Sequence, residues 1–316
     1  MISVIIASDR RVNVLAGCLD SLNKQSILPD EIIIAHAGSD IETKALTEKL
    51  KTDNNFKVNI KYFNLGPLGA AKQRNKGAEE STGDIIFFLD DDVVCEPNYI
   101  KETMYIFLKD NENTIGGVSG TIVNQVYVPL SRFNKKLFDF CLSSVEINDE
   151  YAGRVVGPAV NFLPSDTPNI AQTVDWLPSV CCAYRRNVFF EYMFNEQFKG
   201  YSFMEDVELS CRIGKLYKLI NTTSARLYHE DLGGKTHKNW FDIGKMQVLN
   251  RWHVMVNVLH KNSPANKIRF FYYQIYCMIA EARMFLELPN AKHILLRWIG
   301  RAFGIVKILF DGRYIS

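Results

Sequence analysis

Several kinds of segment are missing from this sequence, and each absence excludes a class of protein. Its 316 residues contain only seven cysteines, an odd number with no Cys-x-x-Cys pair and no spacing typical of a zinc site. No uncharged apolar run is long enough to cross a membrane, and no basic leader with a cleavage site accompanies the apolar residues Ile2–Ile6. We therefore expect neither a disulfide scaffold nor an integral membrane protein, and we predict a protein of the reducing cytoplasm.

The sequence also has little net charge, because 37 Lys and Arg stand against 35 Asp and Glu. The charges are nevertheless distributed unevenly, since residues 238–316 carry 12 Lys and Arg against 4 Asp and Glu. This basic segment is rich in aliphatic residues and lacks any known nucleic-acid motif, so we do not expect it to bind nucleic acid. We predict a main globular domain over residues 1–237 and a helical extension over residues 238–316.

Apolar runs alternate with helical patterns in the first hundred residues. The runs occupy residues 3–7, 31–35, 58–63 and 84–89. Between the first two runs, Val14, Cys18 and Leu22 recur at helical spacing, and a second helical pattern covers residues 68–80. Because continuously apolar strands are buried on both faces, this alternation predicts a parallel sheet covered by helices, which is the doubly wound α/β class.

The rest of the chain contains fewer patterns that indicate secondary structure. We expect helices at residues 99–109 and 203–215 and strands at residues 116–123 and 224–228. Residues 125–175 are poorly periodic and contain four prolines, which predicts a long loop region that serves substrate binding, with regular structure resuming at Trp176. Beyond residue 239 the pattern is helical to about residue 310, with breaks near Pro264 and Pro289.

Three aspartates directly follow the apolar run at residues 84–89. Ligands of an open parallel sheet bind beyond the carboxyl ends of its strands, so Asp90, Asp91 and Asp92 are expected at a ligand site. Because side chains alternate along an extended chain, Asp90 and Asp92 share one side and Asp91 faces the other. Two carboxylates on one side suit Mg²⁺ or Mn²⁺, with substrate phosphate completing the ligand shell. We prefer this interpretation to a solvated turn, because three adjacent like charges repel one another.

Two further strings carry candidate functional groups. Glu205 and Asp206 open a predicted helix, where carboxylates are also favoured because they complement the helix dipole. His229 follows a predicted strand and is flanked by Glu230 and Asp231, so it is a candidate metal ligand.

In combination, these motifs resemble those of the family 2 glycosyltransferases, over roughly residues 1–235. The segments that carry the resemblance are Ser8–Arg11, Cys18–Leu22, Pro29–Ile33, Gly69–Gly77, Gly83–Asp92, Trp176–Pro178, Tyr184–Arg186 and Glu205–Arg212. The resemblance implies a Rossmann-like GT-A domain, with a nucleotide-binding half over residues 1–95 and an acceptor half over residues 96–237. It also implies metal-dependent, inverting transfer of a sugar from a nucleotide-diphosphate sugar.

The resemblance further implies roles for individual residues. Asp90 and Asp92 would be the Asp-x-Asp pair that binds the divalent ion, Mg²⁺ or Mn²⁺, and His229 would join them as a metal ligand. Asp206 would be the general base, with Glu205 beside it as a second catalytic candidate. The residues expected to contact the nucleotide are Ser8, Asp9, Arg11, His36, Arg74, Asp90 and Asp91.

One position departs from the pattern of the family. Relatives usually carry an Asp after the second strand that hydrogen-bonds the nucleotide base, whereas this chain has His36, with Asp40 nearby. A histidine can donate or accept one hydrogen bond at that position. A UDP-sugar is therefore the first candidate donor, and dTDP and GDP remain open.

Two other functions fit part of the sequence. A sugar-phosphate nucleotidyltransferase would use a similar fold and metal site, but such enzymes generally need a glycine-rich loop where this chain has Ser8–Arg11. A nucleotide-sugar-binding module without turnover would explain His36 but not the intact acidic motifs. We predict a hexosyltransferase-like enzyme with a glycan or lipid-linked acceptor, acting, by resemblance, in bacterial-type cell-surface polysaccharide synthesis.

The end of the chain has the pattern of an amphipathic helix over residues 290–311. His293, Arg297, Arg301 and Lys307 lie close to one face, and apolar residues fill much of the remainder. Two interpretations stand at this point. The helix either packs on the catalytic domain with a solvated basic edge, or attaches through its basic residues to the anionic cytoplasmic face of a membrane.

Overall fold

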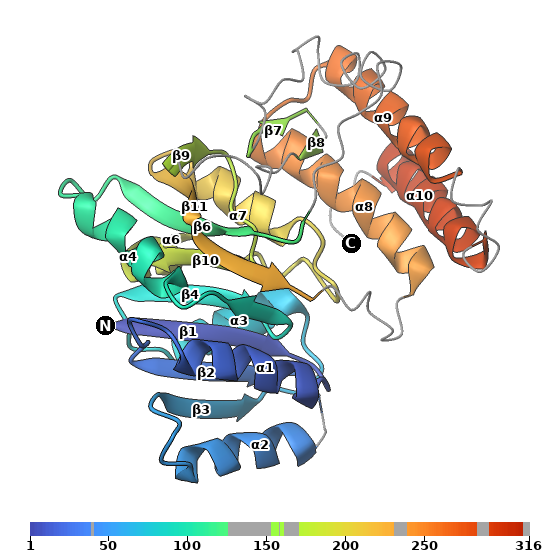
Figure 1. The fold of residues 1–316 in the computed structure, drawn as a ribbon. Helices are drawn as coiled ribbons and strands as arrows, with labels where there is room; N and C mark the ends of the chain where they lie inside the picture. Colours follow the sequence, from blue (N-terminus) through green and yellow to red (C-terminus); the bar gives the residue numbers. More distant parts are fainter. Residues whose placement is uncertain are drawn as a thin grey trace.

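The computed structural model of the protein describes residues 1–38, 41–125, 153–157, 159–160, 171–230, 239–282 and 291–311. Its strands form a twisted central sheet with helices on both faces, and helices from the end of the chain extend from one side of this domain (Figure 1). Most of the predicted loop region at residues 125–175, the predicted break at Pro289, and the residues Asp40 and Asp231 lie outside the described residues.

The first half of the sheet is parallel, as the sequence predicts. Its strands lie in the order β3 (Asn59–Asn64), β2 (Glu31–His36), β1 (Ile2–Ser8) and β4 (Ile85–Asp90). The connecting helices are α1 (Val12–Asn23), α2 (Ile41–Thr52) and α3 (Ala70–Glu79). β1, β2 and β4 are buried over almost their whole length, which is why their sequences are continuously apolar.

The second half of the sheet contains strands of both directions. Beyond β4 the order is β10 (Cys181–Arg185), β6 (Ile115–Ile122), β11 (Lys218–His229) and β5 (Val93–Cys95), with β9 (Ala171–Val174) paired to β11. The short strands β7 (Val155–Val156) and β8 (Ala159–Val160) form a separate pair. Because β10 runs antiparallel to β4 and β5 antiparallel to β11, segments far apart in sequence lie beside the end of β4.

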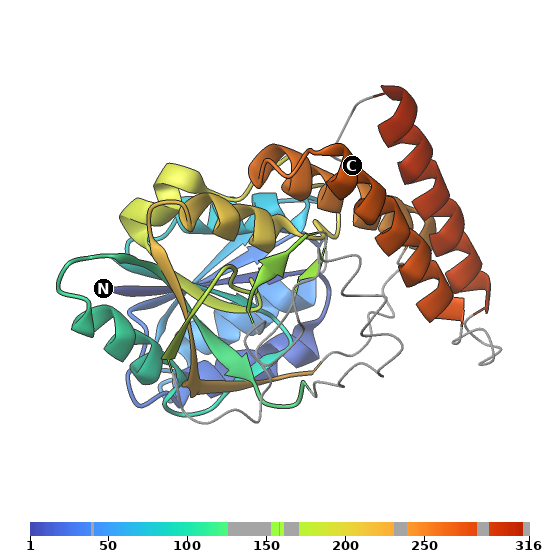
Figure 2. The same ribbon diagram turned by 90° about the horizontal axis from the view of Figure 1, so that it is seen from above.

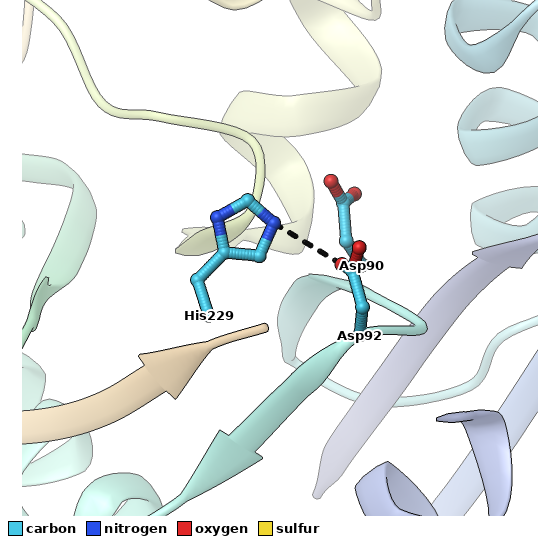
Figure 3. A group of neighbouring side chains, drawn as sticks. All are labelled: Asp90, Asp92 and His229. Atoms are coloured by element: carbon cyan, nitrogen blue, oxygen red, sulfur yellow. Dashed lines mark ion pairs between the residues drawn. The ribbon is translucent and has the colours of Figure 1, made fainter. Parts of the chain in front are cut away.

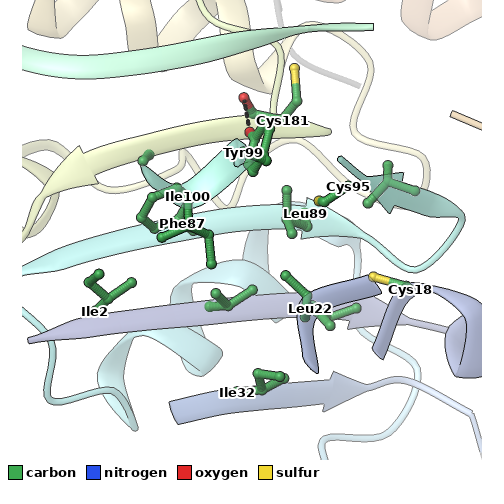
Figure 4. Close-up of a cluster of buried hydrophobic side chains, with 14 of the residues drawn as sticks. Ile2, Cys18, Leu22, Ile32, Phe87, Leu89, Cys95, Tyr99, Ile100 and Cys181 are labelled. Atoms are coloured by element: carbon green, nitrogen blue, oxygen red, sulfur yellow. Dashed lines mark hydrogen bonds between the residues drawn. The ribbon is translucent and has the colours of Figure 1, made fainter. Parts of the chain in front are cut away.

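Helices cover the two faces of the sheet as separate layers. α1, α2 and α4 (Tyr99–Lys109) pack on one face, and α3, α6 (Arg186–Tyr192) and α7 (Glu205–Ile213) pack on the other. Figure 4 shows the first of these interfaces, where Phe87 of β4 lies among apolar side chains that include Leu22 of α1 and Ile100 of α4. The Tyr99 hydroxyl donates to the carbonyl oxygen of Cys181 at 2.8 Å, which ties α4 to β10. Burial of these apolar side chains is the main source of stability.

The structure confirms the α/β class and changes the bounds of several predicted elements. The helix predicted at 203–215 is α7, which begins at Glu205 because Ser202 and Met204 have positive φ angles of 54° and 74°. The strand predicted at 224–228 is the end of β11, which begins at Lys218 because its first half pairs with β6 and β9. Regular structure is present before Trp176, in β9, and Trp176 itself lies in a connection.

The helices that follow β11 pack one upon another. α8 (Trp240–His253) continues into the π-helical turn η2 (Val254–Val258), and α9 (Pro264–Ala282) and α10 (Ala291–Asp311) follow. η2 packs against α7, whereas α9 and α10 project away from the sheet (Figure 2). α10 packs directly on α8. The two backbones approach so closely that a Cβ atom at Gly300 would collide with the carbonyl oxygen of Phe241, and one at Gly244 with that of Arg297. Within the described residues, none of the helices has both the length and the apolar character needed to cross a bilayer.

Candidate active site

Three predicted metal ligands meet at the carboxyl end of β4. Ligand atoms of Asp90, Asp92 and His229 all lie within 4.8 Å of one another, and Figure 3 shows the imidazole turned toward Asp92. His229 Nε2 lies 3.1 Å from Asp92 Oδ1. Carboxylate oxygens and an imidazole nitrogen are donors that Mn²⁺ accepts, so the set fits a divalent ion. Asp91 is fully buried and pairs with Arg11, which also pairs with Asp92. β4 ends at Asp90 and the next two residues form a turn, so the extended-chain alternation expected from the sequence does not extend through Asp91 and Asp92.

Strand pairing explains how His229 reaches this position. β11 pairs with β5 in a register that sets His229 opposite Val93, the residue after Asp92. The backbone N–H of Glu230 donates to the carbonyl oxygen of Asp92 at 2.8 Å, and the side chain of Asn124 bonds the backbone of His229 at 2.8 and 3.0 Å. The backbone therefore holds the histidine beside Asp92.

Arg11 balances the negative charge of this cluster. Its guanidinium donates to Asp91 and, from Nη1 at 2.7 Å, to Asp92 Oδ2. Burial raises the pKa of Asp91 to about 7, although the charge of Arg11 opposes this. Burial also acts to raise the pKa of Asp92, but the hydrogen bond from His229 and the charge of Arg11 outweigh it, and the pKa falls below its ordinary value. Asp92 is thus ionised at neutral pH, as a metal ligand must be.

Arg74 of α3 connects two acidic groups that are far apart in sequence. Its Nη2 donates to Asp90 Oδ1 at 2.7 Å, and its Nη1 donates to Glu205 Oε1 at 2.6 Å. The side chains of Arg74 and Glu205 are 6% and 7% exposed. Burial acts to raise the pKa of Glu205, and the charge of Arg74 opposes this. The terminal nitrogens of Arg74 thus hold carboxylates, and its contact with a nucleotide stays a prediction.

Asp206 follows Glu205 in the first turn of α7 and is less buried. Its Oδ2 accepts a hydrogen bond from the backbone N–H of Ser179 at 3.4 Å, and the Ser179 hydroxyl donates to Glu205 Oε1 at 3.4 Å. Burial raises the pKa of Asp206, although hydrogen bonds from the N–H groups of Val207 and Ser179 oppose this. A raised pKa makes the carboxylate a stronger base. Met204, directly before the helix, is left-handed, a strained conformation that is enriched at functional sites.

The remaining predicted nucleotide contacts lie at the ends of β1 and β2. Ser8 and His36 are 2% and 0% exposed and stand opposite each other in the β1–β2 ladder. The centroid of the His36 ring lies 5.7 Å from that of Tyr62. Asp9 is half-buried and pairs with its neighbour Arg10. Since Ala7 of β1 is in register with Asp90 of β4, these residues lie at the same edge of the sheet as the acidic cluster. Their role in nucleotide binding stays a prediction.

The structure thus brings together motifs that are separate in the sequence. The metal-ligand candidates and the Glu205–Asp206 pair lie on either side of Arg74. Ser179, which contacts both Glu205 and Asp206, is not among the residues predicted from the sequence. The available signal was its position directly after Trp176–Pro178, a segment that carries part of the family resemblance.

Comparison with known proteins finds similarity over the first half of the chain. The family model for Glycosyl transferase family 2 matches residues 3–156. EpsH of Bacillus subtilis (strain 168) is 38% identical over 104 residues, which are 33% of this chain and 29% of that protein. The O-antigen chain rhamnosyltransferase RfbN of Salmonella typhimurium is 32% identical over 108 residues, which are 34% of this chain and 33% of that protein. This chain thus matches no more than about a third of the length of these two relatives.

Likeness of fold extends over the whole chain. The solved structure of the mannosyltransferase PcManGT from Pyrobaculum calidifontis, in complex with GDP-Man and Mn²⁺, superposes with a TM-score of 0.59 at 14% sequence identity. The superposition covers 98% of this chain and 87% of that chain, and at this identity it concerns the fold alone. The sequence match and the doubly wound sheet agree with each other: residues 3–156 match the model of glycosyl transferase family 2, and the chain has the GT-A fold.

Proposed function

We propose that the protein is a metal-dependent, inverting glycosyltransferase that moves a sugar from a nucleotide-diphosphate sugar to an acceptor hydroxyl. The observation that carries the proposal is the bridge through Arg74, which joins Asp90 of the metal-ligand cluster to Glu205, the neighbour of Asp206. Inverting transfer is one in-line displacement, in which a base takes the acceptor proton while positive charge stabilises the departing diphosphate. The site supplies separate carboxylates for the two tasks.

Asp206 is the residue that we assign as the general base. Glu205 is buried and ion-paired with Arg74, whereas Asp206 is partly exposed and forms no ion pair among the described residues. An acceptor hydroxyl can therefore reach Asp206 more readily, and the raised pKa of Asp206 favours proton transfer to it. Glu205 takes a positioning role, since it holds Arg74 and Ser179 beside the base.

Asp90, Asp92 and His229 would hold the divalent ion, because their donor atoms are the appropriate types and already lie within 4.8 Å of one another. When bound, Mg²⁺ or Mn²⁺ supplies positive charge against the diphosphate of the leaving nucleotide. Arg11 adds a second cation on the same side. Its side chain is 30% exposed, so it can donate to a phosphate oxygen while it keeps Asp91 and Asp92 paired.

The acceptor that we propose is a glycan or lipid-linked glycan, in the synthesis of a cell-surface polysaccharide at the cytoplasmic face of the membrane. Support comes from the relative RfbN, whose name describes transfer to an O-antigen chain. For the donor we propose a hexose or similar sugar on UDP in the first place. GDP and dTDP belong in the same test, because His36 replaces the expected aspartate and the PcManGT structure contains GDP-Man.

A panel of donors tests the proposed function. The full-length protein is incubated with Mn²⁺ and UDP-, dTDP- or GDP-sugars, and the released nucleotide is measured with and without EDTA. Release of a nucleoside diphosphate from one donor, abolished by EDTA, is the expected result. Formation of pyrophosphate from a sugar phosphate and a nucleoside triphosphate would instead identify a nucleotidyltransferase. Donor binding without any release would identify a binding module.

A further inference from the structure

The outermost helices turn apolar side chains toward the outside. On α9 these are Ile268, Tyr272, Ile275 and Ile279, each at least 51% exposed. On α10 they are Leu295, Ile299, Phe303, Val306, Leu309 and Phe310, each at least 49% exposed. We call these ten residues the outer rows; they are ten of the eighteen large hydrophobic side chains exposed in the described part of the chain. α9 and α10 lie beside each other at the end of the molecule away from the sheet (Figures 1 and 2).

The two arginines of α10 face the protein. Arg301 is 4% exposed and donates to Glu281 of α9 at 2.9 Å. Arg297 lies 3.1 Å from the same carboxylate and over the ring of Trp240, on which His293 stacks. This orientation is opposite to the predicted solvated basic edge, because the basic side chains find a carboxylate and an aromatic ring inside. α10 thus turns its arginines inward together with Ile294 and Ile308 and still exposes a row of large apolar side chains, which indicates an apolar environment outside.

The charge near the outer rows is positive. Among the described side chains of residues 239–282 and 291–310, the carboxylates are Asp242, which pairs with Lys245, and Glu281, which pairs with the two arginines. Lys267 of α9 and Lys292 of α10 are exposed. Within the described residues the surface thus combines apolar side chains and lysines with no unpaired carboxylate. This combination is complementary to anionic lipid headgroups above acyl chains.

We propose that the outer rows of α9 and α10 are a membrane-docking face, which enters the boundary between headgroups and acyl chains of an anionic lipid surface. A lipid surface fits better than a second copy of the chain, because two copies would bring their exposed lysines together without carboxylates to pair them. Docking is peripheral, and it depends on the apolar rows, not on the arginines of α10. The inference does not rest on the proposed transferase activity, because lipid binding requires no donor.

Vesicle flotation tests the proposal with the full-length protein. The vesicles contain phosphatidylcholine, with or without phosphatidylglycerol, and the protein is expected to float with the anionic vesicles. The double variant Ile299→Glu, Val306→Glu should lower the partition coefficient by roughly tenfold or more, since charge replaces apolar area that the lipid buries. The variant Ile275→Glu, Ile279→Glu makes the same test on α9 if the first variant fails to fold.

Leu216→Glu is the matched control, because Leu216 is 73% exposed in the turn after α7. It should leave flotation unchanged. Thermal melting and donor hydrolysis without vesicles separate a docking defect from a loss of fold or of activity. Failure of the wild-type protein to float, or undiminished flotation of folded outer-row variants, would overturn the proposal. Light scattering tests the alternative of a second copy. If the wild-type protein formed a dimer that the outer-row variants dissociate, and if it did not bind vesicles, the proposal would be overturned in favour of a second copy.

Discussion

Arg74 Nη1 lies 2.6 Å from Glu205 Oε1, a contact between residues 131 positions apart in the sequence. Both side chains are buried, and the second terminal nitrogen of the same guanidinium holds Asp90. Removing one member of a buried charge pair leaves the other uncompensated, which destabilises a protein by about 3–5 kcal/mol. The acidic site therefore depends on this arginine for its stability as well as for its geometry.

We expect Arg74→Met to lower the free energy of unfolding by about 3 kcal/mol and to abolish sugar transfer. The double variant Arg74→Met, Glu205→Gln should regain part of the stability, because no uncompensated glutamate remains, but none of the activity. Urea denaturation and donor hydrolysis measure the two effects separately. If the urea concentration at the midpoint of unfolding were the same for Arg74→Met and wild type, the pairing of Arg74 with the carboxylates would not stabilise the fold.

Asp92→Asn should weaken Mn²⁺ binding by at least about tenfold, because the amide removes one charged ligand from the cluster of Asp90, Asp92 and His229. Electron paramagnetic resonance of free Mn²⁺ measures the affinity without any donor. Asp20→Asn is the control, since Asp20 is an exposed carboxylate on α1 paired only with Lys24 among the described residues. If the two variants bound Mn²⁺ with equal affinity, Asp92 would be excluded as a metal ligand.

Glu31 contributes to stability through a set of buried hydrogen bonds. It accepts from the Ser3 hydroxyl and the Thr82 N–H, both at 2.6 Å, and pairs with Lys61. Burial acts to raise the pKa of Glu31, but these partners outweigh it and lower the pKa to about 2. Because the pKa is lowered on folding, the stabilisation is complete above the unfolded value of 4.5 and is lost as the pH falls toward 2.

We expect Glu31→Gln to lower the free energy of unfolding at pH 7 by about 3 kcal/mol, and the difference from wild type to shrink below pH 4.5. Urea denaturation at a series of pH values measures this. Glu48→Gln, at an exposed site on α2, should change stability by less than about 0.5 kcal/mol. A Glu31 deficit that stayed constant down to pH 2 would contradict the account.

Gly300→Ala should displace α10 from α8, since the added Cβ would meet the backbone of Phe241. We expect a loss of about 1–3 kcal/mol in unfolding free energy and faster amide exchange in α10. Gly17→Ala is the control, because a Cβ there meets nothing within 4 Å, and helix propensity predicts a gain of about 0.5–1 kcal/mol. Equal effects of the two substitutions would contradict the close packing.

Local patterns predicted the parallel half of the fold and much of the site. Continuous apolar runs identify β1, β2 and β4, because strands covered on both faces are apolar along most of their length. The expected proximity of Asp90 and Asp92 is present, but it arises from the turn that follows β4 and not from alternation along an extended chain, and Asp91 shares Arg11 with Asp92.

Contacts that depend on strand order or on neighbouring helices could not be predicted in this way. The Arg74–Glu205 pair and the role of Ser179 require α3, α7 and the segment before β10 to converge at the end of β4. The periodicity of α10 identifies two faces but not which one faces inward. That choice depends on Glu281 of α9, which makes buried arginines favourable.

The most direct measurement is donor affinity and turnover of Asp206→Asn in the same preparation, with the donor identified by the panel. We predict that the dissociation constant of the donor changes by less than about threefold, while turnover falls by about 10²–10⁴-fold, because a general base acts in the transition state. Turnover near the wild-type value, or a loss of donor binding as large as the loss of turnover, would contradict the assignment of Asp206 as the base.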